Sequence, residues 1–465
     1  MKLWKTSKDT LSVKDIEDTL EKHEEEVKPR LDKLWQYYEG KNPSILSRPK
    51  GDPNNPDNRT PVSYARKIVT TFTGYAYRPR YTTYKVEEDA FESYMIALHE
   101  TFNLSREHIR THRAGRNTAI FGAAYELMYI DEFNRQAEPR FIAVDPREMV
   151  LLYDYSPDPV IKMGIRYYRI TDDLQKVEVY YPDRIELYER RRDDKSEWQV
   201  FPTGTEANYF DAVPIIPYYM GDDRLGVIDP VIPLIDDYDI IFSDSINEFE
   251  RFAHAYMRMV KMGLVSPELK KEPTALSQAL RRLRQLRVFE NLPEKDAVTF
   301  LTKDIPKDFI EWMTETLREQ IHVQSHVPDF SSERFGTAMS GAAIDRLLFD
   351  FENVVSSAEA DFETGLYRRI ELINAIYRKT GKLSGEAPSV VITHKRNMPT
   401  NMEEFAKTAV SLKQAGFSRY LIADAMPDDL IPDVEQELER QDEDMAAFRT
   451  LMPDVDEETE DDAES

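Results

Sequence analysis

The chain has 465 residues, enough for about three domains of ordinary size, and 41% of them are apolar, enough to build a core. It contains no cysteine, which excludes disulfides, thiolate metal sites and cysteine nucleophiles and is typical of a reducing compartment. The net charge of −25 argues against tight nucleic-acid binding, because neutralisation of phosphates dominates such affinity.

Neither hydropathy nor the first residues give a membrane or export signal. No run of 18 apolar residues is present, and residues 1–14 lack the apolar centre of a signal peptide. We therefore expect a soluble protein that is intracellular when it is made. Acidic charge is concentrated at the end, where residues 428–465 hold 17 Asp or Glu and 2 Arg. Residues 453–465 are expected to be disordered.

The first quarter of the chain predicts helices. Residues 12–27 place apolar side chains on one face, with Ser12 as the capping residue, and Pro29 separates them from a second helix. Helical spacing returns at 62–75, 90–98 and 106–119. Between these helices, residues 40–61 are rich in Pro, Gly and Asn. This segment is too long for an ordinary connection, so it is either mobile or held by a neighbour.

From residue 124 the period changes to that of strands. Apolar and polar residues alternate, as in half-buried antiparallel strands. The predicted strands cover residues 125–130, 140–144, 149–153, 161–170, 176–181, 185–190 and 198–201. Helices precede this block and no βαβ series is present, so the sequence predicts an α+β fold.

Three long helices are predicted in the second half, at residues 233–260, 307–326 and 341–380. At 1.5 Å per residue the first is about 40 Å long and the third about 50 Å. Ser340 is the expected cap of the third helix, and Gly381 its end. The first helix carries acidic residues opposite its apolar stripe, which we interpret as a solvated face. These are Asp236, Asp237, Asp239, Asp244 and Glu248.

A basic unit, residues 261–304, separates the first two long helices. Four arginines lie at its centre: Arg281, Arg282, Arg284 and Arg287. Together with the leucines between them they form either a solvated helix face or a docking surface for an acidic partner or phosphate. Beyond the third helix we predict a strand at 389–393, a helix from the capping box Asn401 and Glu404 to Gly416, and helices at 418–425 and 433–448.

The sequence gives little evidence of a catalytic site. The sequence has no phosphate-binding P-loop, no Gly-x-Gly-x-x-Gly and no Gly-x-Ser-x-Gly. Asp183 and Glu186 are the carboxylates on which a nuclease interpretation would depend, but no Glu-x-Lys follows nearby. The pairs His108/His112 and His322/His326 have the spacing of a zinc protease, yet Ile109 replaces the catalytic Glu. We interpret them as surface or interface histidines and expect no metal and no cofactor.

Several sequence blocks occur in an order that resembles a known family. They are residues 35–41, 58–64, 122–129, 144–148, 229–239, 245–250, 327–336 and 340–343. Their order, and the succession of helix, excursion, helix, loop and helix, resemble the portal proteins of tailed bacteriophages, of the type in long-tailed phages of Gram-positive bacteria. The resemblance covers roughly residues 30–445.

The resemblance implies a predominantly helical portal fold that assembles as a ring, commonly of twelve subunits and of thirteen in some free rings. It assigns residues 1–230 to an α/β wing, 231–260 to a stem helix, 261–304 to a clip, and 305–326 to the returning stem helix. A tunnel loop would occupy 327–340, a long helix and wing return 341–399, a crown 400–450, and an acidic tail 451–465.

The resemblance also implies partners. Double-stranded DNA would pass through the channel during packaging and ejection, bound weakly and without sequence preference. The clip, with its four arginines, would dock the large terminase and later the head–tail connector or adaptor. Scaffold and major capsid proteins would surround the ring. The protein would be a virion component at the capsid vertex, present in the host cytoplasm during assembly and without enzymatic activity. A packaging nuclease and a non-ring scaffold or adaptor are the alternatives.

The tunnel loop has the composition expected of a surface that DNA passes. Its small polar residues would bind phosphate weakly, and Gly336 and Gly341 would let the loop change shape. Glu333 and Arg334 either face DNA or join neighbouring copies, and we favour the second arrangement. The predicted channel residues are Ser331, Ser332, Glu333, Arg334, Thr337 and Ser340.

Overall fold

The computed structural model describes residues 3–49, 55–80, 82–86, 91–133, 136–192, 198–253, 256–259, 298–301, 307–331, 341–396, 402–426, 431 and 434–451. The chain divides into two compact units, one of Met1–Asp329 with Asp350–Lys395 and one of Phe330–Phe349 with Arg396–Ser465. Helices and sheets are both extensive, which confirms the α+β class. Among the described helices, none is long and apolar enough to cross a membrane.

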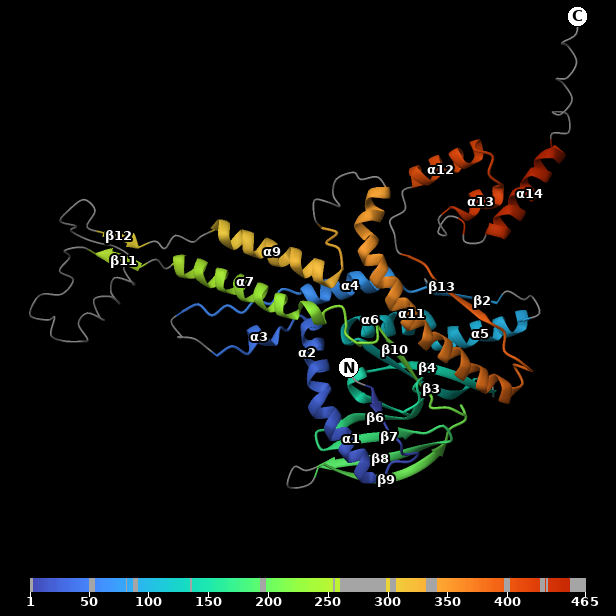
Figure 1. Cartoon of the computed structure of the whole chain (residues 1–465), viewed down its shortest axis with the longest axis horizontal. Helices are drawn as coiled ribbons and strands as arrows, with labels where there is room; N and C mark the ends of the chain where they lie inside the picture. Colours follow the sequence, from blue (N-terminus) through green and yellow to red (C-terminus); the bar gives the residue numbers. More distant parts are fainter. Residues whose placement is uncertain are drawn as a thin grey trace, which may run out of the picture. The chain divides into compact units, whose positions relative to one another are not determined.

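The larger unit contains a six-stranded sheet in the order β1-β5-β6-β7-β8-β9 (Figure 1). Its strands are antiparallel except for β1, which runs parallel to β5. Their bounds are β1 (Trp4–Lys5), β5 (Met149–Tyr153), β6 (Ile161–Thr171), β7 (Leu174–Tyr180), β8 (Arg184–Arg192) and β9 (Trp198–Ala207). The five strands predicted between residues 149 and 201 are thus confirmed as β5 to β9, whereas β1 was not predicted.

Both faces of this sheet are covered, so its central strands are buried. Along β5, Val150 and Leu152 pack with Ile16 and Leu20 of α1 (Val13–Glu26). The alternate residues, Leu151 and Tyr153, pack with the second sheet. Because successive side chains of a strand point to opposite faces, one face of β5 packs on α1 and the other on the second sheet. Helix α1 begins where predicted, with Ser12 and Asp15 forming a reciprocal capping box.

A three-stranded antiparallel sheet lies against the large sheet. Its order is β10-β3-β4, with β10 (Ile215–Tyr219), β3 (Ala123–Phe133) and β4 (Gln136–Val144). Strand β10 was not predicted, because Pro214 and Pro217 interrupt the strand pattern. Proline is tolerated there because β10 is an edge strand. Strand β2 (Thr82–Val86), which pairs with β13 (Val390–His394), was also missed.

Helices α5 (Glu92–Ser105) and α6 (Glu107–Phe121) lie on the small sheet, above it in Figure 1. Helix α4 (Tyr64–Ala76) packs on α6, and the 40-residue α11 (Gly341–Thr380) contacts β10, where Arg368 donates to the Ile215 carbonyl. The predicted third long helix is therefore confirmed. Arg369 of α11 is fully buried and its guanidinium donates to Glu126 of β3 at 2.9 and 3.0 Å. It also lies 3.4 Å from Glu107 of α6, so one cation joins sheet and helices.

His23 on α1 gives the larger unit a sensitivity to acid. The side chain is buried and hydrogen-bonds with the Tyr167 hydroxyl at 2.9 Å. Burial, with a smaller effect of Lys28, lowers its pKa to about 4. Since the unfolded chain takes up a proton near pH 6.5 and the folded chain does not, stability falls as the pH drops from 6.5 to 4.

The free energy of unfolding should therefore fall less on acidification in His23→Phe than in the wild type, by up to about 3 kcal/mol. Urea denaturation at pH 7 and pH 4.5 measures it, with the exposed His99 replaced by Gln as the control. Equal pH slopes in wild type and His23→Phe would show that other groups cause the acid loss.

The smaller unit is helical where it is described. It contains α12 (Met402–Gln414), α13 (Arg419–Asp424) and α14 (Val434–Leu451), close to the predicted segments. Ser418 caps α13 by accepting from the Leu421 amide, and Arg419 forms an ion pair with Asp442 of α14 at 2.7 Å. The predicted cap Asn401 lies outside the described residues.

Candidate functional site

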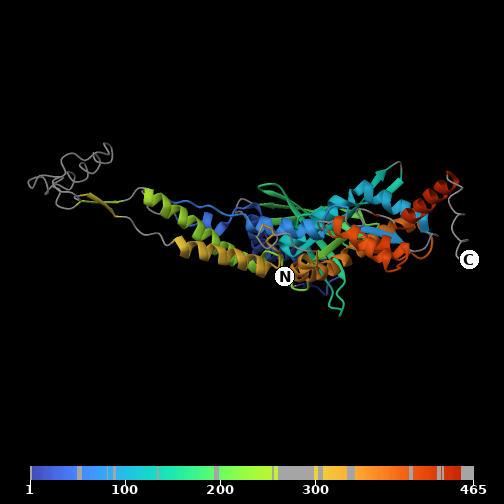
Figure 2. The same cartoon turned by 90° about the horizontal axis from the view of Figure 1, so that it is seen from above.

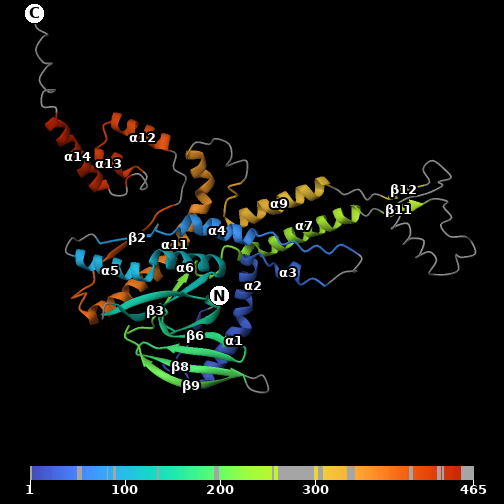
Figure 3. The same ribbon diagram turned by 180° about the vertical axis from the view of Figure 1, so that it is seen from behind.

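Two helices of the larger unit lie side by side, as Figures 1, 2 and 3 show from three directions. They are α7 (Ile232–Ala253) and α9 (Lys307–Ser325). Beyond α7, β11 (Tyr256–Met259) pairs antiparallel with β12 (Val298–Leu301), which leads toward α9. The prediction of a helix up to residue 260 is therefore wrong. Tyr256 continues the helical spacing, but a partner strand about forty residues later in the chain turns this segment into β-structure.

The acidic face of α7 is not the solvated face that we predicted. Asp239 is fully buried, and it accepts hydrogen bonds from the Asn42 side chain at 2.7 Å and from the Val62 amide at 2.8 Å. Asp236 accepts from the hydroxyls of Tyr37 on α2 (Lys28–Glu39) and Ser44 on α3 (Pro43–Leu46), at 2.6 and 3.0 Å. Only Asp237 and Asp244 remain exposed, and Asp244 faces Arg48 at 3.4 Å.

Residues 55–63, which we call the strap, are held along α7 by a regular ladder. Three side chains four residues apart on α7 accept amide hydrogen bonds from alternate strap residues. The pairs are Asp239 with Val62 at 2.8 Å, Ser243 with Thr60 at 3.0 Å and Asn247 with Asn58 at 2.6 Å. Four helical residues rise about 6 Å and two extended residues about 6.7 Å, so the spacings match. The described part of segment 40–61 is thus held by a neighbour.

Replacing Asp239 should release the strap. We expect Asp239→Ala to destabilise the larger unit by about 2–4 kcal/mol, because two buried donors lose their acceptor. Cleavage between residues 55 and 63 by a protease of broad specificity should also become faster. The matched control is Asp237→Ala, an exposed residue of the same helix. If both variants resist cleavage equally, the ladder does not hold the strap in place.

The root of the predicted tunnel loop, residues 327–329, is anchored to α9 and α4. The His322 Nδ1–H donates to the Val327 carbonyl at 2.8 Å, and Val327 is buried. Lys67 of α4 donates to the Asp329 carboxylate at 2.8 Å, while Arg318 and His322 of α9 each lie 3.8 Å from it. Burial lowers the pKa of His322 below its ordinary value, so the imidazole is neutral at pH 7. The predicted tunnel loop therefore begins at residues that contacts with α9 and α4 hold in place.

Most residues predicted for the channel and the clip lie outside the described part of the chain. Ser331 is described and exposed, and Gly341 is the first residue of α11. Outside the described residues are Ser332, Glu333, Arg334, Gly336, Thr337, Ser340, Arg281, Arg282, Arg284 and Arg287. Sequence reasoning missed the ladder, although the i, i+4, i+8 spacing of Asp239, Ser243 and Asn247 was a usable signal.

Asp183 and Glu186, the carboxylates on which the nuclease interpretation depends, both form ion pairs within this chain. Arg184 lies between them, with Asp183 at 3.1 Å and Glu186 at 2.8 Å. The Tyr188 hydroxyl also donates to Glu186. Within the described residues no group of three or more His, Asp or Glu could hold a metal ion. His112, one of the histidines with the spacing of a zinc protease, donates from Nδ1 to the Tyr77 carbonyl at 2.7 Å.

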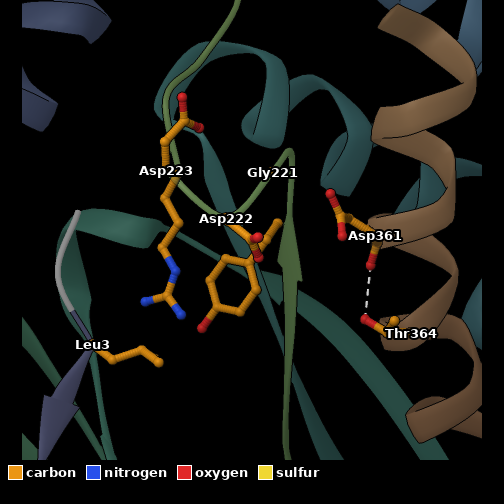
Figure 4. A pocket seen from close by; sticks show the side chains of 8 residues that line it. Leu3, Gly221, Asp222, Asp223, Asp361 and Thr364 are labelled. Carbon is orange, nitrogen blue, oxygen red and sulfur yellow. Dashed lines mark hydrogen bonds between the residues drawn. The ribbon is translucent and has the colours of Figure 1, made fainter. Parts of the chain in front are cut away.

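A pocket of about 460 Å³ lies beside α11 (Figure 4). Asp222, which follows β10, and Asp361 of α11 both line it. Burial, with the charge of Asp222 as a smaller cause, raises the pKa of Asp361. Arg224 also lines the pocket, but its guanidinium lies 4.0 Å from the centre of the Tyr219 ring. The remaining lining residues include Leu3, Gly221, Asp223 and Thr364.

Comparison with known proteins gives the following similarities. Residues 17–447 match the family described as phage portal protein, SPP1 Gp6-like. The portal protein of Bacillus phage SPP1 is 24% identical over 351 residues, which are 72% of this chain and 67% of that protein. Two solved structures are each 11% identical with a TM-score of 0.41. One chain is from the neck of an empty gene transfer agent particle, where 76% of this chain matches 86% of that one. The other is from a native gene transfer agent virion, with 83% and 90% matched.

Proposed function

Because the chain belongs to the phage portal protein family, SPP1 Gp6-like, we propose that it forms a ring at one capsid vertex. Double-stranded DNA passes through the central channel of this ring, inward during packaging and outward during ejection. A portal protein is a virion component, and the surrounding partners are scaffold and major capsid proteins. The ring has about twelve subunits, as the resemblance to this family implies.

The observation that carries this proposal is the pairing of α7 and α9. The two helices lie side by side and the chain between them includes the β11–β12 pair, as a stem with a clip at its end requires. Large apolar side chains remain exposed on both helices. They are Phe242 and Phe249 on α7, and Phe309 and Trp312 on α9, with exposed fractions of 36%, 69%, 55% and 57%. These side chains are exposed in a single chain, and contact between the stems of neighbouring subunits would bury them.

The loop after α9 lines the channel in this proposal. Its root is fixed by Lys67 and His322, so only the residues beyond it change position as DNA moves. Ser331, Ser332, Thr337 and Ser340 make weak contacts with the DNA. Glu333 and Arg334 join neighbouring loops, and Gly336 and Gly341 are the hinges.

The clip, residues 261–304, docks the large terminase and later the head–tail connector. Arg281, Arg282, Arg284 and Arg287 present the basic surface for these partners. Residues 400–450 form the crown. The proposed role is structural, so no residue is assigned to catalysis.

Light scattering on purified protein tests the assembly. The mass of one chain is 54.3 kDa, and a ring gives a single species at a multiple of about twelve. A monodisperse species of one chain at every concentration would count against the proposal.

A further inference from the structure

Four arginines lie along one side of α6, three within the helix and one just before it. Arg110, Arg113 and Arg116 follow one another at steps of three residues, and Arg106 precedes the helix by one residue. Such steps place the side chains on one face. Arg106 and Arg113 are exposed, and Arg110 and Arg116 are half-buried. The opposite side, which includes Thr111, Ala114 and Thr118, is buried against the rest of the unit. We call the four residues the arginine face.

The arginine face forms no ion pair in the described part of the chain. No carboxylate of the described residues lies within ion-pair distance of its guanidinium groups, and the polar contact seen is from Arg116 to the Asn117 amide at 3.4 Å. Several other arginines of the same unit are paired with acids. Arg30 binds Asp229 and Arg147 binds Asp145, at 2.7 and 2.6 Å. An unpaired basic face is unexpected in a chain with a net charge of −25.

Two of the four guanidinium groups are partly shielded. The Nε atoms of Arg110 and Arg116 are shielded from solvent and have no acceptor among the described residues. A partner therefore reaches these two groups through their terminal nitrogens. A guanidinium binds a carboxylate in this way with two parallel hydrogen bonds.

We propose that the arginine face binds carboxylates of a neighbouring copy of this chain, in a head-to-tail contact between subunits. The inference rests on the proposed ring and names one of its contact surfaces. A two-fold contact through the same surface would place arginine against arginine, which repel. The face must therefore meet a different, acidic surface of the next copy. Such a heterologous contact repeats from copy to copy, and it closes into a ring when the rotation between copies completes a full turn.

Composition favours a protein partner over DNA. The face contains Arg and no Lys, and protein interfaces are enriched in Arg and depleted in Lys. It also includes the half-buried apolar residue Ile109, and Ile96 on the adjacent helix α5 is 64% exposed. A copy of this chain supplies acids in excess, with 86 Asp or Glu against 61 Lys or Arg. Phosphates of duplex DNA could satisfy the same guanidinium groups, so DNA binding is an outcome of the test.

Charge reversal tests the contact. The variant Arg110→Glu with Arg113→Glu is compared with Arg169→Glu plus Arg191→Glu, two exposed arginines of the large sheet with the same change of charge. Light scattering and sedimentation should show that the first variant needs at least about tenfold more protein to assemble, since like charges now face each other. The second should assemble like the wild type. Circular dichroism checks that both variants fold.

Three results would overturn the inference. If the first variant assembles like the wild type, the face is not a subunit contact, and the proposed ring still stands. If it assembles normally but loses affinity for a duplex of about 30 base pairs, the face binds DNA. If the wild type itself never assembles, the proposed ring fails and this contact fails with it.

The acidic partner can be identified directly. Arg113→Lys keeps the charge and supplies an amine for carbodiimide coupling to a carboxylate in contact with it. Isotopically light and heavy chains are mixed before assembly, so that a bond between copies gives mixed-isotope peptides. We expect the introduced lysine to appear in such mixed peptides with an Asp or Glu of the neighbour. Cross-links found within single chains alone would contradict the proposal.

Discussion

A chain that lacks residues 331–339 is expected to assemble into rings like the wild type and to fail in packaging DNA. The deletion begins after the anchored root of the loop, where Lys67 holds Asp329 and His322 holds Val327. It ends before α11 begins at Gly341. The contacts that position α9 and α11 in the larger unit are therefore retained, while the proposed channel surface is lost.

The measurement has two parts. Electron microscopy counts rings, and a packaging reaction with terminase and empty heads measures DNA protected from nuclease. A variant with the same nine positions replaced by Gly and Ser is the control, since it keeps the length of the loop and removes its side chains. This control should assemble into rings. If it packages DNA like the wild type, the length of the loop is what matters, and if it packages as poorly as the deletion, the side chains are needed. Loss of rings in the deletion variant would show instead that the loop is structural.

Replacing Arg369 by Met is expected to destabilise the larger unit by about 3–5 kcal/mol, because buried carboxylates lose their cation. Glu126 is fully buried and accepts from Arg369 through both oxygens. It also accepts from the Tyr218 hydroxyl at 2.7 Å, and Glu107 lies nearby on α6. Since the cluster joins α6, α11 and β3, its loss should loosen the attachment of α11 to the sheet.

Chemical denaturation of the larger unit measures this effect. Arg378→Met, a change at an exposed position of the same helix, should alter stability by less than about 0.5 kcal/mol. Combining Arg369→Met with Glu126→Gln should recover part of the loss, because one uncompensated charge is removed. If Arg369→Met is as stable as the control, the ion pair does not hold α11 in place.

The sequence predicted the helices and most strands because their signals are local. Ser12 caps the first helix as expected, and the alternation in residues 161–170 appears as β6. The 40 residues of α11 follow one apolar stripe, which ends before Gly381. In each case a period or a cap within a dozen residues determines the element.

The errors arose where distant residues decide the structure. Tyr256 continues the helical spacing of α7, but pairing with Leu301 places it in a strand. Asp239 looked like a solvated acid, yet Asn42 and Val62, nearly 200 residues earlier, bury it and satisfy its oxygens. Pairing and burial of this kind depend on tertiary contacts that propensity and charge pattern do not report.

Negative-stain electron microscopy of the purified protein tests whether this chain builds a ring with a channel. We expect annular particles with a stain-filled central hole and one rotational symmetry. Compact particles without a hole would contradict the proposed ring and favour a non-ring scaffold or adaptor.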